Sequence, residues 1–436
     1  MYEQHIKGWF DGQASQPDSG AYQMTNYQLK CLKTDEKFED EYTLHYNDGA
    51  LVQAVYREKF EPIEKEGVWR YFNWLPTKKT SYQTAGTVTY KAEKLGNELG
   101  FSNLWIAFHG YWPEKGGICP TGSFKDMEAV PTIQRMKDHS CKGMICASAG
   151  NTARAFTHFC AEDNFPLIVV VADIHAHRIW VQKGMEMDSV KVVVVKNGTY
   201  QDAKDVAKEL SKSLEGWQLE GGAHNIARRD GIGSLILDSY EEIGKLPDHY
   251  FQAVGGGPGP IGVYEMMQRL IDSEHYDGKV ARIHLSQNPE HCPIHNAWQR
   301  KSRDFDSGDF PESNVEVYSD YLLSETPAYS AIGGVYDILE ASNGQTYIVE
   351  ENDAIEAGNI LETVEGIDVL SPAKVALASL IQAEENGDVS KDDCILLNVS
   401  GGGVERLKGE KETEIVKPWI ADIKENLVEK VLESLK

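Results

Sequence analysis

Short, continuously apolar segments, each followed by a segment with helical periodicity, recur along most of this chain and restrict the folds open to it. Two of them, "FPLIVVVAD" (165–173) and "VKVVVVKNG" (190–198), carry apolar side chains at successive rather than alternate positions. A strand of this kind is buried on both faces, as in a parallel sheet that helices cover on either side. The sequence therefore predicts an α/β fold built on parallel sheets.

The alternation continues on both sides of these strands. Further strands are predicted in "GMICASAG" (143–150), "HYFQAVGGG" (249–257), "VARIHLSQ" (280–287) and "CILLNVSGGG" (394–403). Helices are predicted in "NTARAFTHFCAEDN" (151–164), "TYQDAKDVAKELSKSLE" (199–215), "PIGVYEMMQRLIDSEHY" (260–276), "SPAKVALASLIQAEENG" (371–387) and the closing "ADIKENLVEKVLESLK" (421–436). Residues 1–75 differ, because "YQLKCLKTDEKFEDEYTLHYNDGALVQAVY" (27–56) alternates and carries turn signals, which predicts a small β-rich extension.

Charge and length exclude several functions. The 436 residues carry a formal net charge of −25, which argues against nucleic acid and anionic membrane as partners, since both require a basic face. No apolar run reaches the roughly 18 residues that span a bilayer, and the N-terminus lacks a signal-peptide pattern, so a cytoplasmic protein is expected. The seven cysteines form no C-x-x-C pair, so neither a disulfide framework nor a metal site is expected.

Four turns at predicted strand or helix ends carry candidate functional groups. They are "TGSFKD" (121–126) with Lys125, "SAGNT" (148–152), "GGGPGPIG" (255–262) and "NVSGGG" (398–403) with Ser400. Taken singly, each has an ordinary alternative: a surface lysine, a helix cap, a tight structural turn and a turn serine. The third is neither a G-x-G-x-x-G motif nor a P-loop, so nucleotide binding by those routes is disfavoured.

The four turns together indicate one chemistry. Ligands of parallel sheets bind in the loops at the carboxyl ends of strands, where these turns are expected. A lysine amine, a glycine-rich helix start for a phosphate, a loop of amides and hydroxyls for a carboxylate, and a hydroxyl for a ring nitrogen are the parts of a pyridoxal phosphate site. The sequence thus predicts pyridoxal 5'-phosphate as cofactor.

In this order, the motifs resemble those of the fold type II pyridoxal phosphate enzymes, the tryptophan synthase β-subunit class, from about residue 76 to 405. The resemblance implies two parallel-sheet domains after the N-terminal extension (1–75), with 76–129 and 223–436 forming the large, cofactor-binding domain and 130–222 the small one. It also implies a homodimer. The threonine synthase branch, with "GSFKDRG" at its lysine, is the most similar, although here methionine replaces that arginine and the cysteine-rich ribbon of that branch is missing.

The resemblance implies roles for residues of all four turns. Lys125 would carry the cofactor as a Schiff base and move the α-proton, and Ser400 would meet the pyridine nitrogen. Asn151 would bond the ring oxygen. The cofactor phosphate would be held by Gly255, Gly256, Gly257 and Gly259, and the substrate carboxylate by Ser148, Ala149, Gly150 and Thr152.

Other stretches resemble a narrower group, the cysteate synthases, which join O-phospho-L-serine to sulfite. These are "GYWPE" (110–114), "EAVPTIQRMK" (128–137), "SAGNTARAF" (148–156), "GGAHNIARRDG" (221–231) and "LPDHYFQAVG" (246–255). A β-replacement that yields L-cysteate and phosphate is therefore expected. Threonine synthase acting on O-phosphohomoserine, another β-replacement such as cysteine synthesis, and a non-catalytic cofactor-binding relative stay open as alternatives.

Anionic substrates require local positive charge in so acidic a protein. Guanidinium groups suit phosphate and sulfonate oxygens. "GGAHNIARRDG" brings His224, Arg228 and Arg229 together in a predicted loop, and Arg154 opens the helix after "SAGNT". Arg228 is the candidate for substrate binding, with a surface salt-bridge network as the alternative. Thr121 and His109, just before the lysine, are further candidates, with plain packing as the alternative.

Overall fold

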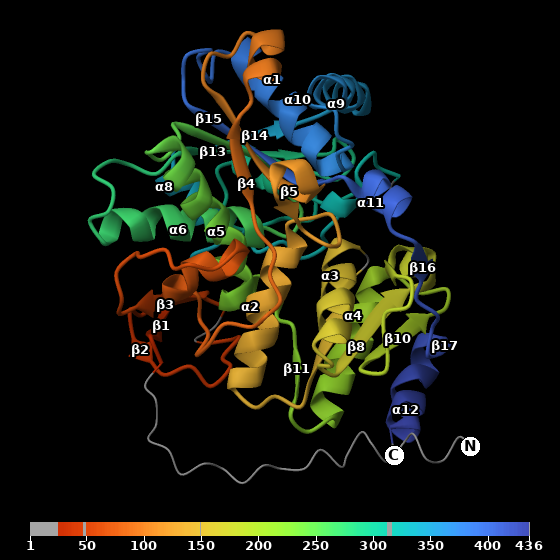
Figure 1. Ribbon diagram of the computed structural model, residues 1–436. Helices are drawn as coiled ribbons and strands as arrows, with labels where there is room; N and C mark the ends of the chain where they lie inside the picture. Colours follow the sequence, from red (N-terminus) through yellow and green to blue (C-terminus); the bar gives the residue numbers. More distant parts are fainter. Residues whose placement is uncertain (1–24, 47–48, 149, 312–315, 436) are drawn as a thin grey trace.

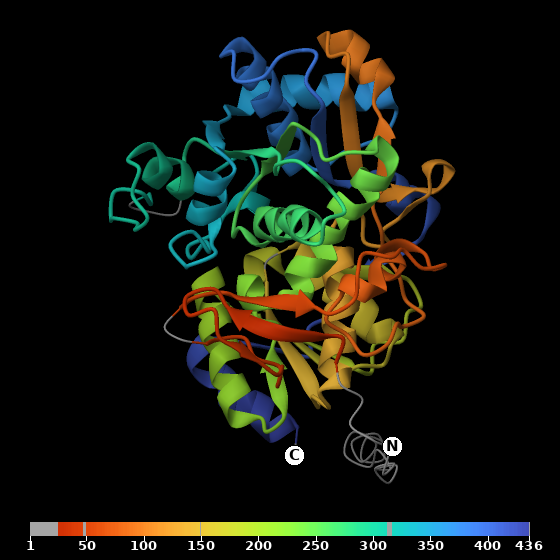
Figure 2. The same cartoon turned by 90° about the vertical axis from the view of Figure 1, so that its left-hand side faces the viewer.

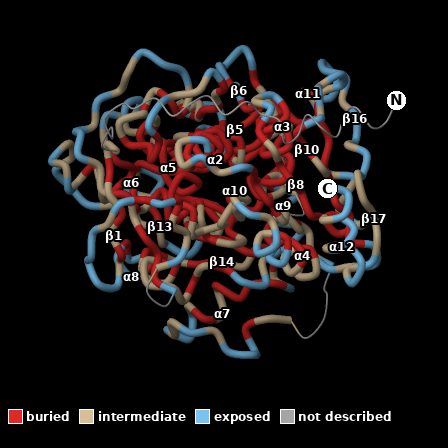
Figure 3. Tube along the Cα trace, turned by 90° about the horizontal axis from the view of Figure 1, so that it is seen from below, coloured by how far each residue is buried: buried red, intermediate tan, exposed pale blue. Residues whose placement is uncertain are grey.

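The computed structural model describes residues 25–46, 49–148, 150–311 and 316–435. Two sheets flanked by helices make up most of the molecule, and the predicted α/β class is confirmed (Figure 1). The six residues of strand β8 (Leu167–Ala172) are all buried, as expected for a strand with apolar side chains on both faces. Figure 3 shows buried chain running through the centre of the molecule, with exposed segments mostly at its periphery.

The larger sheet has the strand order β14-β13-β12-β15-β5-β4, with β6 paired to β5. Its strands are β4 (Val88–Lys91), β5 (Leu104–Trp112), β6 (Gly117–Ile118), β12 (His249–Ala253), β13 (Arg282–Gln287), β14 (Gln345–Ile348) and β15 (Ile395–Gly402). All neighbours are parallel except β4 and β6, which run antiparallel to β5. The sheet thus aligns the carboxyl ends of β12 and β15, where two of the predicted turns lie.

The helices outside the smaller sheet's layer were predicted in part, at 260–276 and 371–387. They are α1 (Glu93–Leu99), α2 (Lys125–Asp138), α5 (Ile226–Ile243), α6 (Pro258–Asp272), α7 (Pro293–Gln299), α8 (Val335–Ala341), α9 (Glu351–Glu365), α10 (Ser371–Glu385) and α11 (Val404–Glu410). Single turns of 3-10 helix occur at Pro113–Lys115, Gly222–His224 and Asp320–Leu322, with longer ones at Gly67–Trp74 and Asp173–Arg178. Helix α10 is buried along most of its length, because apolar residues and alanines occupy nearly every position between Pro372 and Leu380.

The smaller sheet is parallel throughout, in the order β11-β7-β8-β10-β17. Its remaining strands are β7 (Gly143–Ala147), β10 (Val190–Val195), β11 (Trp217–Leu219) and β17 (Ile420–Asp422). Helices α3 (Asn151–Glu162) and α4 (Tyr200–Ser213) connect its strands, and α4 begins with a capping box of Thr199 and Asp202.

The C-terminal segment departs from the predicted division, which assigned all of 223–436 to the large domain. Strand β17 pairs in parallel with β10, and Leu427 and Val431 of helix α12 (Lys424–Ser434) pack in the same apolar cluster as Val206 and Leu210 of α4. Strand β16 (Thr413–Ile415), which precedes β17 in the chain, pairs with β9 (Trp180–Gln182) (Figure 1). The division into domains stays a prediction, and the topology places this segment beside the smaller sheet.

The N-terminal extension forms an antiparallel sheet, in agreement with its predicted β-rich character. Its described strands, β1 (Tyr27–Cys31), β2 (Lys37–Phe38) and β3 (Val52–Tyr56), lie in the order β2-β1-β3 beside helix α5 (Figure 2). Tyr56 donates to Asp230 of α5 at 2.6 Å, and Ile226 shares an apolar cluster with Tyr27. The extension therefore supports the helix that carries Arg228.

Candidate active site

The turn that precedes Lys125 is fixed to strand β15 by backbone contacts. The Phe124 N–H donates to the Ser400 carbonyl at 3.0 Å, and the Gly402 N–H donates to the Gly122 carbonyl at 3.1 Å. Gly122 has a φ of +77°, a conformation that glycine adopts without the steric cost of a Cβ. Lys125, the first residue of α2, is therefore held close to Ser400.

The Lys125 amine lies in a largely buried setting. Only 16% of its side chain is exposed, and its Nζ lies 3.2 Å from Oε2 of Glu128 and 4.4 Å from the Phe124 ring centroid. Burial lowers the pKa of the Lys125 amine, and the carboxylate of Glu128 opposes that effect. A lysine with a lowered pKa is more readily neutral, the form in which an amine attacks a carbonyl.

The glycine turn joins β12 to helix α6. Continuing the parallel register of β12 with β15, in which Phe251 pairs with Leu397, brings this turn level with Ser400. Gly257 precedes α6 with a φ of +94°, and a Cβ there would lie 2.6 Å from Val335. At Gly256 a Cβ would have no neighbour closer than 3.7 Å, so the turn is open on this side. Gly259 instead packs against Gln252, where a Cβ would lie 2.5 Å from Nε2.

Asn151 begins helix α3, and its side-chain amide has a defined orientation. Oδ1 accepts from Nη2 of Arg154 at 2.8 Å, and because a guanidinium can only donate, the NH₂ group of Asn151 is left as a donor. The same arginine donates to the Thr121 carbonyl at 2.9 Å and lies over the Trp180 ring at 4.7 Å from its centroid. Arg154 thus joins the Asn151 loop to the lysine turn.

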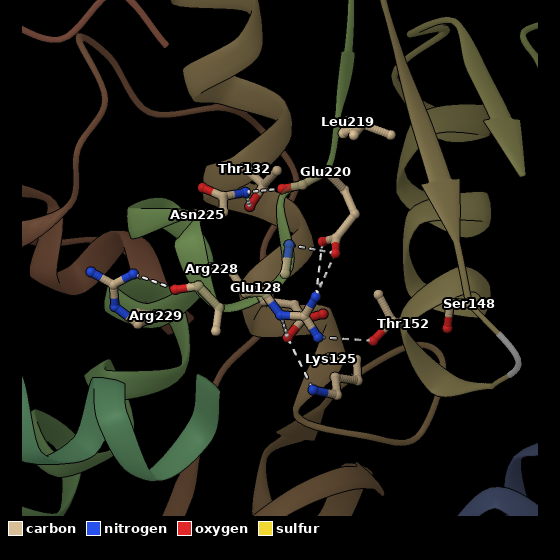
Figure 4. A network of polar contacts seen from close by, with 12 residues as sticks. Lys125, Glu128, Thr132, Ser148, Thr152, Leu219, Glu220, Asn225, Arg228 and Arg229 are labelled. Carbon is tan, nitrogen blue, oxygen red and sulfur yellow. Dashed lines mark hydrogen bonds and ion pairs between the residues drawn. The ribbon is translucent and has the colours of Figure 1, made fainter. Parts of the chain in front are cut away.

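The predicted carboxylate loop lies on the smaller sheet, between β7 and α3. Ser148 accepts from the Gly150 N–H at 3.4 Å, and Thr152 lies in the first turn of α3. Ala149 lies outside the described residues. Figure 4 shows Ser148 and Thr152 on this element, with Lys125 on the element facing them. The structure therefore brings these residues to the boundary between the two sheets.

Arg228 lies on helix α5 and not in a loop, which corrects the prediction for "GGAHNIARRDG". The sequence beyond Asn225 is helical because the Asn225 side chain caps α5, accepting from the Ala227 N–H at 3.0 Å. Arg228 and Arg229, as neighbours on a helix, point in different directions. Arg229 pairs with Glu265, whereas Arg228 faces Lys125 (Figure 4).

Every nitrogen of the Arg228 guanidinium has a contact within the protein. Nη1 donates to both oxygens of Glu220 at 2.8 and 2.9 Å, and Nη2 donates to Oγ1 of Thr152 at 3.2 Å. Nε lies 2.9 Å from Oε2 of Glu128 in an ion pair that lacks hydrogen-bond geometry. That Arg228 receives a substrate anion stays a prediction. The contacts give Arg228 a structural role in a salt-bridge network, which was the alternative to substrate binding. The network is buried, whereas the alternative expected it at the surface.

The other two predicted candidates are engaged in contacts of their own. His109 is fully buried, with Nε2 3.0 Å from the Thr87 hydroxyl and Nδ1 3.2 Å from the Val399 carbonyl. Burial lowers its pKa to about 4. Thr121 donates from both its N–H and its hydroxyl to Asp126. A direct contact of either with substrate stays a prediction.

Three residues of this region were not predicted as a connected set. Anionic substrates lead one to expect basic residues at the site, so the carboxylates of Glu128 and Glu220 were not predicted there. Arg154 was considered only as a ligand for a substrate anion. Charged residues are normally exposed, so sequence alone gives no reason to place these inside. The one available signal was the spacing of Lys125 and Glu128, which puts both on one face of a helix.

Comparisons with known proteins show the family of this chain. A family model described as pyridoxal-phosphate dependent enzyme matches residues 86–401. The chain belongs to this family. Its cofactor is accordingly pyridoxal 5'-phosphate, as predicted. The matched range includes the first three turns and the fourth as far as Gly401, so that Lys125, Asn151 and Ser400 all lie within it.

Curated relatives narrow the family further. The chain is 43% identical over 392 residues to cysteate synthase from Methanosarcina barkeri, covering 88% of this chain and 94% of that protein. It is 38% identical over 423 residues to cysteate synthase from Methanococcoides burtonii, covering 95% and 99%. Membership in a cysteate synthase branch, predicted from its motifs, is confirmed.

Solved structures agree on the fold. Maize serine racemase superposes with a TM-score of 0.59 at 16% identity, covering 74% of this chain and 91% of its own. Serine racemase from Dictyostelium discoideum superposes with a TM-score of 0.54 at 17% identity, covering 73% and 92%. The predicted fold type II class is confirmed.

The residues at the site fit the cofactor. A largely buried amine, an amide whose donor side is left free by Arg154, and a glycine turn open at Gly256 before a helix N-terminus match its aldehyde, ring oxygen and phosphate.

Across the described part of the chain, none of the helices combines the length and hydropathy required for a membrane span.

Proposed function

We propose that the protein converts O-phospho-L-serine and sulfite to L-cysteate and phosphate. The observation that carries the proposal is the identity of 38–43% to curated cysteate synthases over most of the chain. Lys125 in its buried turn provides the amine that such a reaction requires. No comparison favours threonine synthase or a non-catalytic relative.

The chain's own residues account for the binding of the cofactor and the handling of the proton. Pyridoxal phosphate, when bound, withdraws electrons from the α-carbon of an amino acid and acidifies its α-proton. Lys125 would attach the cofactor covalently and, once released, take that proton at Nζ. Asn151 and Ser400 would orient the ring, and the turn at Gly255–Gly257 would bind the phosphate.

Substrate binding is assigned to the loop of the smaller sheet. Thr152 accepts a hydrogen bond from Arg228, so its own hydroxyl hydrogen points elsewhere and is free to donate to a carboxylate. Ser148 and Gly150 flank it. Loss of phosphate from the β-carbon then leaves an acceptor for the sulfur of sulfite, which forms the new C–S bond.

Arg154 supports an anionic substrate in a protein of net charge −25. Its guanidinium is buried, and it donates to two neutral oxygens, the Thr121 carbonyl and Asn151 Oδ1. Among the described residues no carboxylate forms an ion pair with it, and the nearby carboxyl group of Asp126 offsets its charge only from a greater distance. Its charge therefore supplies local positive potential for phosphate and sulfite.

Product identification tests the proposal. The cofactor-loaded protein is incubated with O-phosphoserine, with and without sulfite, and with O-phosphohomoserine in parallel, and products are measured by mass spectrometry. Cysteate formed only with sulfite supports the proposal. Threonine from phosphohomoserine without cysteate would transfer the function to threonine synthase. Size-exclusion chromatography and cell fractionation test the accompanying proposals of a homodimer and a cytoplasmic location.

A further inference from the structure

Glu128 is the carboxylate in contact with the Lys125 amine, and the proposed reaction assigns it no task. Its side chain is fully buried, and Oε2 lies 3.2 Å from Lys125 Nζ and 2.9 Å from Arg228 Nε (Figure 4). Oε1 has no hydrogen-bond partner among the described residues. Burying a carboxylate is costly unless cations and donors compensate it, so a purely packing role would be better filled by an apolar residue.

The same carboxylate reaches the substrate loop through Arg228. Glu128 and Glu220 hold the guanidinium from two sides, and its remaining nitrogen Nη2 donates to Thr152. The hydroxyl of Thr152 is thereby fixed as an acceptor from the arginine and a donor in another direction. Glu128 thus contacts the Lys125 amine directly, and it orients the Thr152 hydroxyl through Arg228.

We propose that Glu128 is a positioning residue that holds the Lys125 amine and the Arg228 guanidinium in one arrangement, and so couples the catalytic base to the substrate-carboxylate loop. This inference deepens the proposed function and rests on it for the identity of the substrate. The contact between Glu128 and Lys125 does not depend on which substrate is used.

The charges around the amine give the inference a measurable consequence. Lys125 faces Glu128 from its own helix, Arg228 from α5, and Glu220 from the segment before α5. With Glu128 present, two carboxylates balance one guanidinium and the ammonium. Without its charge, Arg228 repels the ammonium while only the more distant Glu220 favours it, and the amine loses its proton more readily.

The test compares Glu128→Gln with Glu265→Gln in the full-length protein stripped of cofactor. Glu265 is a matched control, because it is also buried, pairs with the Nε of an arginine at 3.0 Å, and has an unpartnered Oε1, but its partner is Arg229. Lys125 is labelled with acetic anhydride across a pH series and quantified by peptide mass spectrometry. We expect Glu128→Gln to raise the labelling rate below the amine's titration range on the order of tenfold, with Glu265→Gln unchanged. A Glu128→Gln profile that coincides with the Glu265→Gln profile overturns the proposal.

A second variant covers a failure of Glu128→Gln to fold, and a second readout tests the same inference in the cofactor-loaded enzyme. Glu128→Asp keeps the charge but withdraws it by one methylene, so a smaller shift in the same direction is expected, and no shift overturns the proposal. In the cofactor-loaded enzyme, the pH dependence of the cofactor's visible absorbance is expected to change in Glu128→Gln and not in Glu265→Gln. Since labelling needs no substrate, absence of cysteate formation would reject the proposed function and leave this result standing.

Discussion

The Phe124 N–H donates to the Ser400 carbonyl at 3.0 Å, one residue before Lys125, the lysine proposed to carry the cofactor, and at the residue proposed to meet the pyridine nitrogen. An isolated bridge between Ser123 and Gly401 extends the contact. Lys125 and Ser400 are far apart in the sequence, but these contacts between backbone groups fix their relative positions. The distance between the lysine and the serine, which a cofactor ring must span, is therefore determined by the turn before Lys125 and by strand β15.

Lys125→Ala should abolish covalent cofactor attachment and turnover. The variant loses the amine that attaches the cofactor and takes the α-proton, so a rate loss of at least about 10²–10⁴-fold is expected. The measurement is cysteate formation together with the visible absorbance of the purified protein. Retention of either property at the wild-type level would contradict the assignment of Lys125.

Gly256→Ala should weaken cofactor binding without weakening the fold. A Cβ at this position has no neighbour closer than 3.7 Å, so only the space proposed for the phosphate is lost. We expect the cofactor dissociation constant to rise about tenfold or more, the equivalent of about 1.4 kcal/mol. Gly244→Ala, on an open αL cap at φ +79°, is the control for backbone strain alone.

Arg228→Met should destabilise the protein strongly, because it leaves Glu128 and Glu220 buried without their cation. Removal of one partner from a buried ion pair costs about 3–5 kcal/mol. Urea denaturation followed by circular dichroism measures the effect, and Arg406→Met, which breaks a surface pair with Glu114, should change little. A loss of stability no greater than that of Arg406→Met would show that the network is not structural. The Michaelis constant for O-phosphoserine should also rise, since Thr152 loses its partner.

Arg154→Gln should raise the Michaelis constants for O-phosphoserine and sulfite together. The charge of this buried guanidinium, which forms no ion pair with the described residues, is lost, while glutamine keeps a donor for the Thr121 carbonyl. An increase of about tenfold or more is expected for removal of a charge-assisted contribution. Steady-state kinetics with each substrate varied in turn provide the measurement, and constants that remain at their wild-type values would place the source of positive potential elsewhere.

His109 should make the fold less stable as the pH falls. Burial lowers its pKa to about 4, so between that value and the ordinary value of about 6.5 the unfolded chain binds a proton that the folded protein resists. Its contribution, up to about 3 kcal/mol, is therefore present above pH 6.5 and lost as the pH falls to about 4. His109→Asn should flatten the pH dependence of urea unfolding in this window, and a slope as steep as that of the exposed control His177→Asn would contradict the prediction.

Strand–helix alternation made much of the fold predictable, because β8 is apolar throughout and β10 carries four successive valines. The three-residue strands β9, β11, β16 and β17 were missed. Such short strands carry no periodicity of their own, and their pairing is decided by distant chain. Residues 421–436 were predicted as one helix with a charged face, and nothing in that pattern indicated that Ile420–Asp422 forms a strand beside β10.

The four turns of the site were predictable because each lies at the end of a recognisable strand or the start of a helix. The buried charge network was not. Nothing in "FKDMEA" distinguishes a buried Glu128 from a solvated one, and the capped start of α5 at Asn225 turned an expected basic loop into a helix with divergent arginines. Burial of charge depends on three elements meeting, which local sequence does not specify.

The pairing of β17 with β10 has a consequence for biosynthesis. The smaller sheet begins with residues made early, at Gly143, but its outer strand is Ile420–Asp422. Until those residues leave the ribosome, β10 has an open edge and the apolar face of α4 lacks Leu427 and Val431. An unpaired parallel strand is prone to association with other chains. Synthesis of this protein thus includes a period in which the smaller sheet is present without its edge strand Ile420–Asp422.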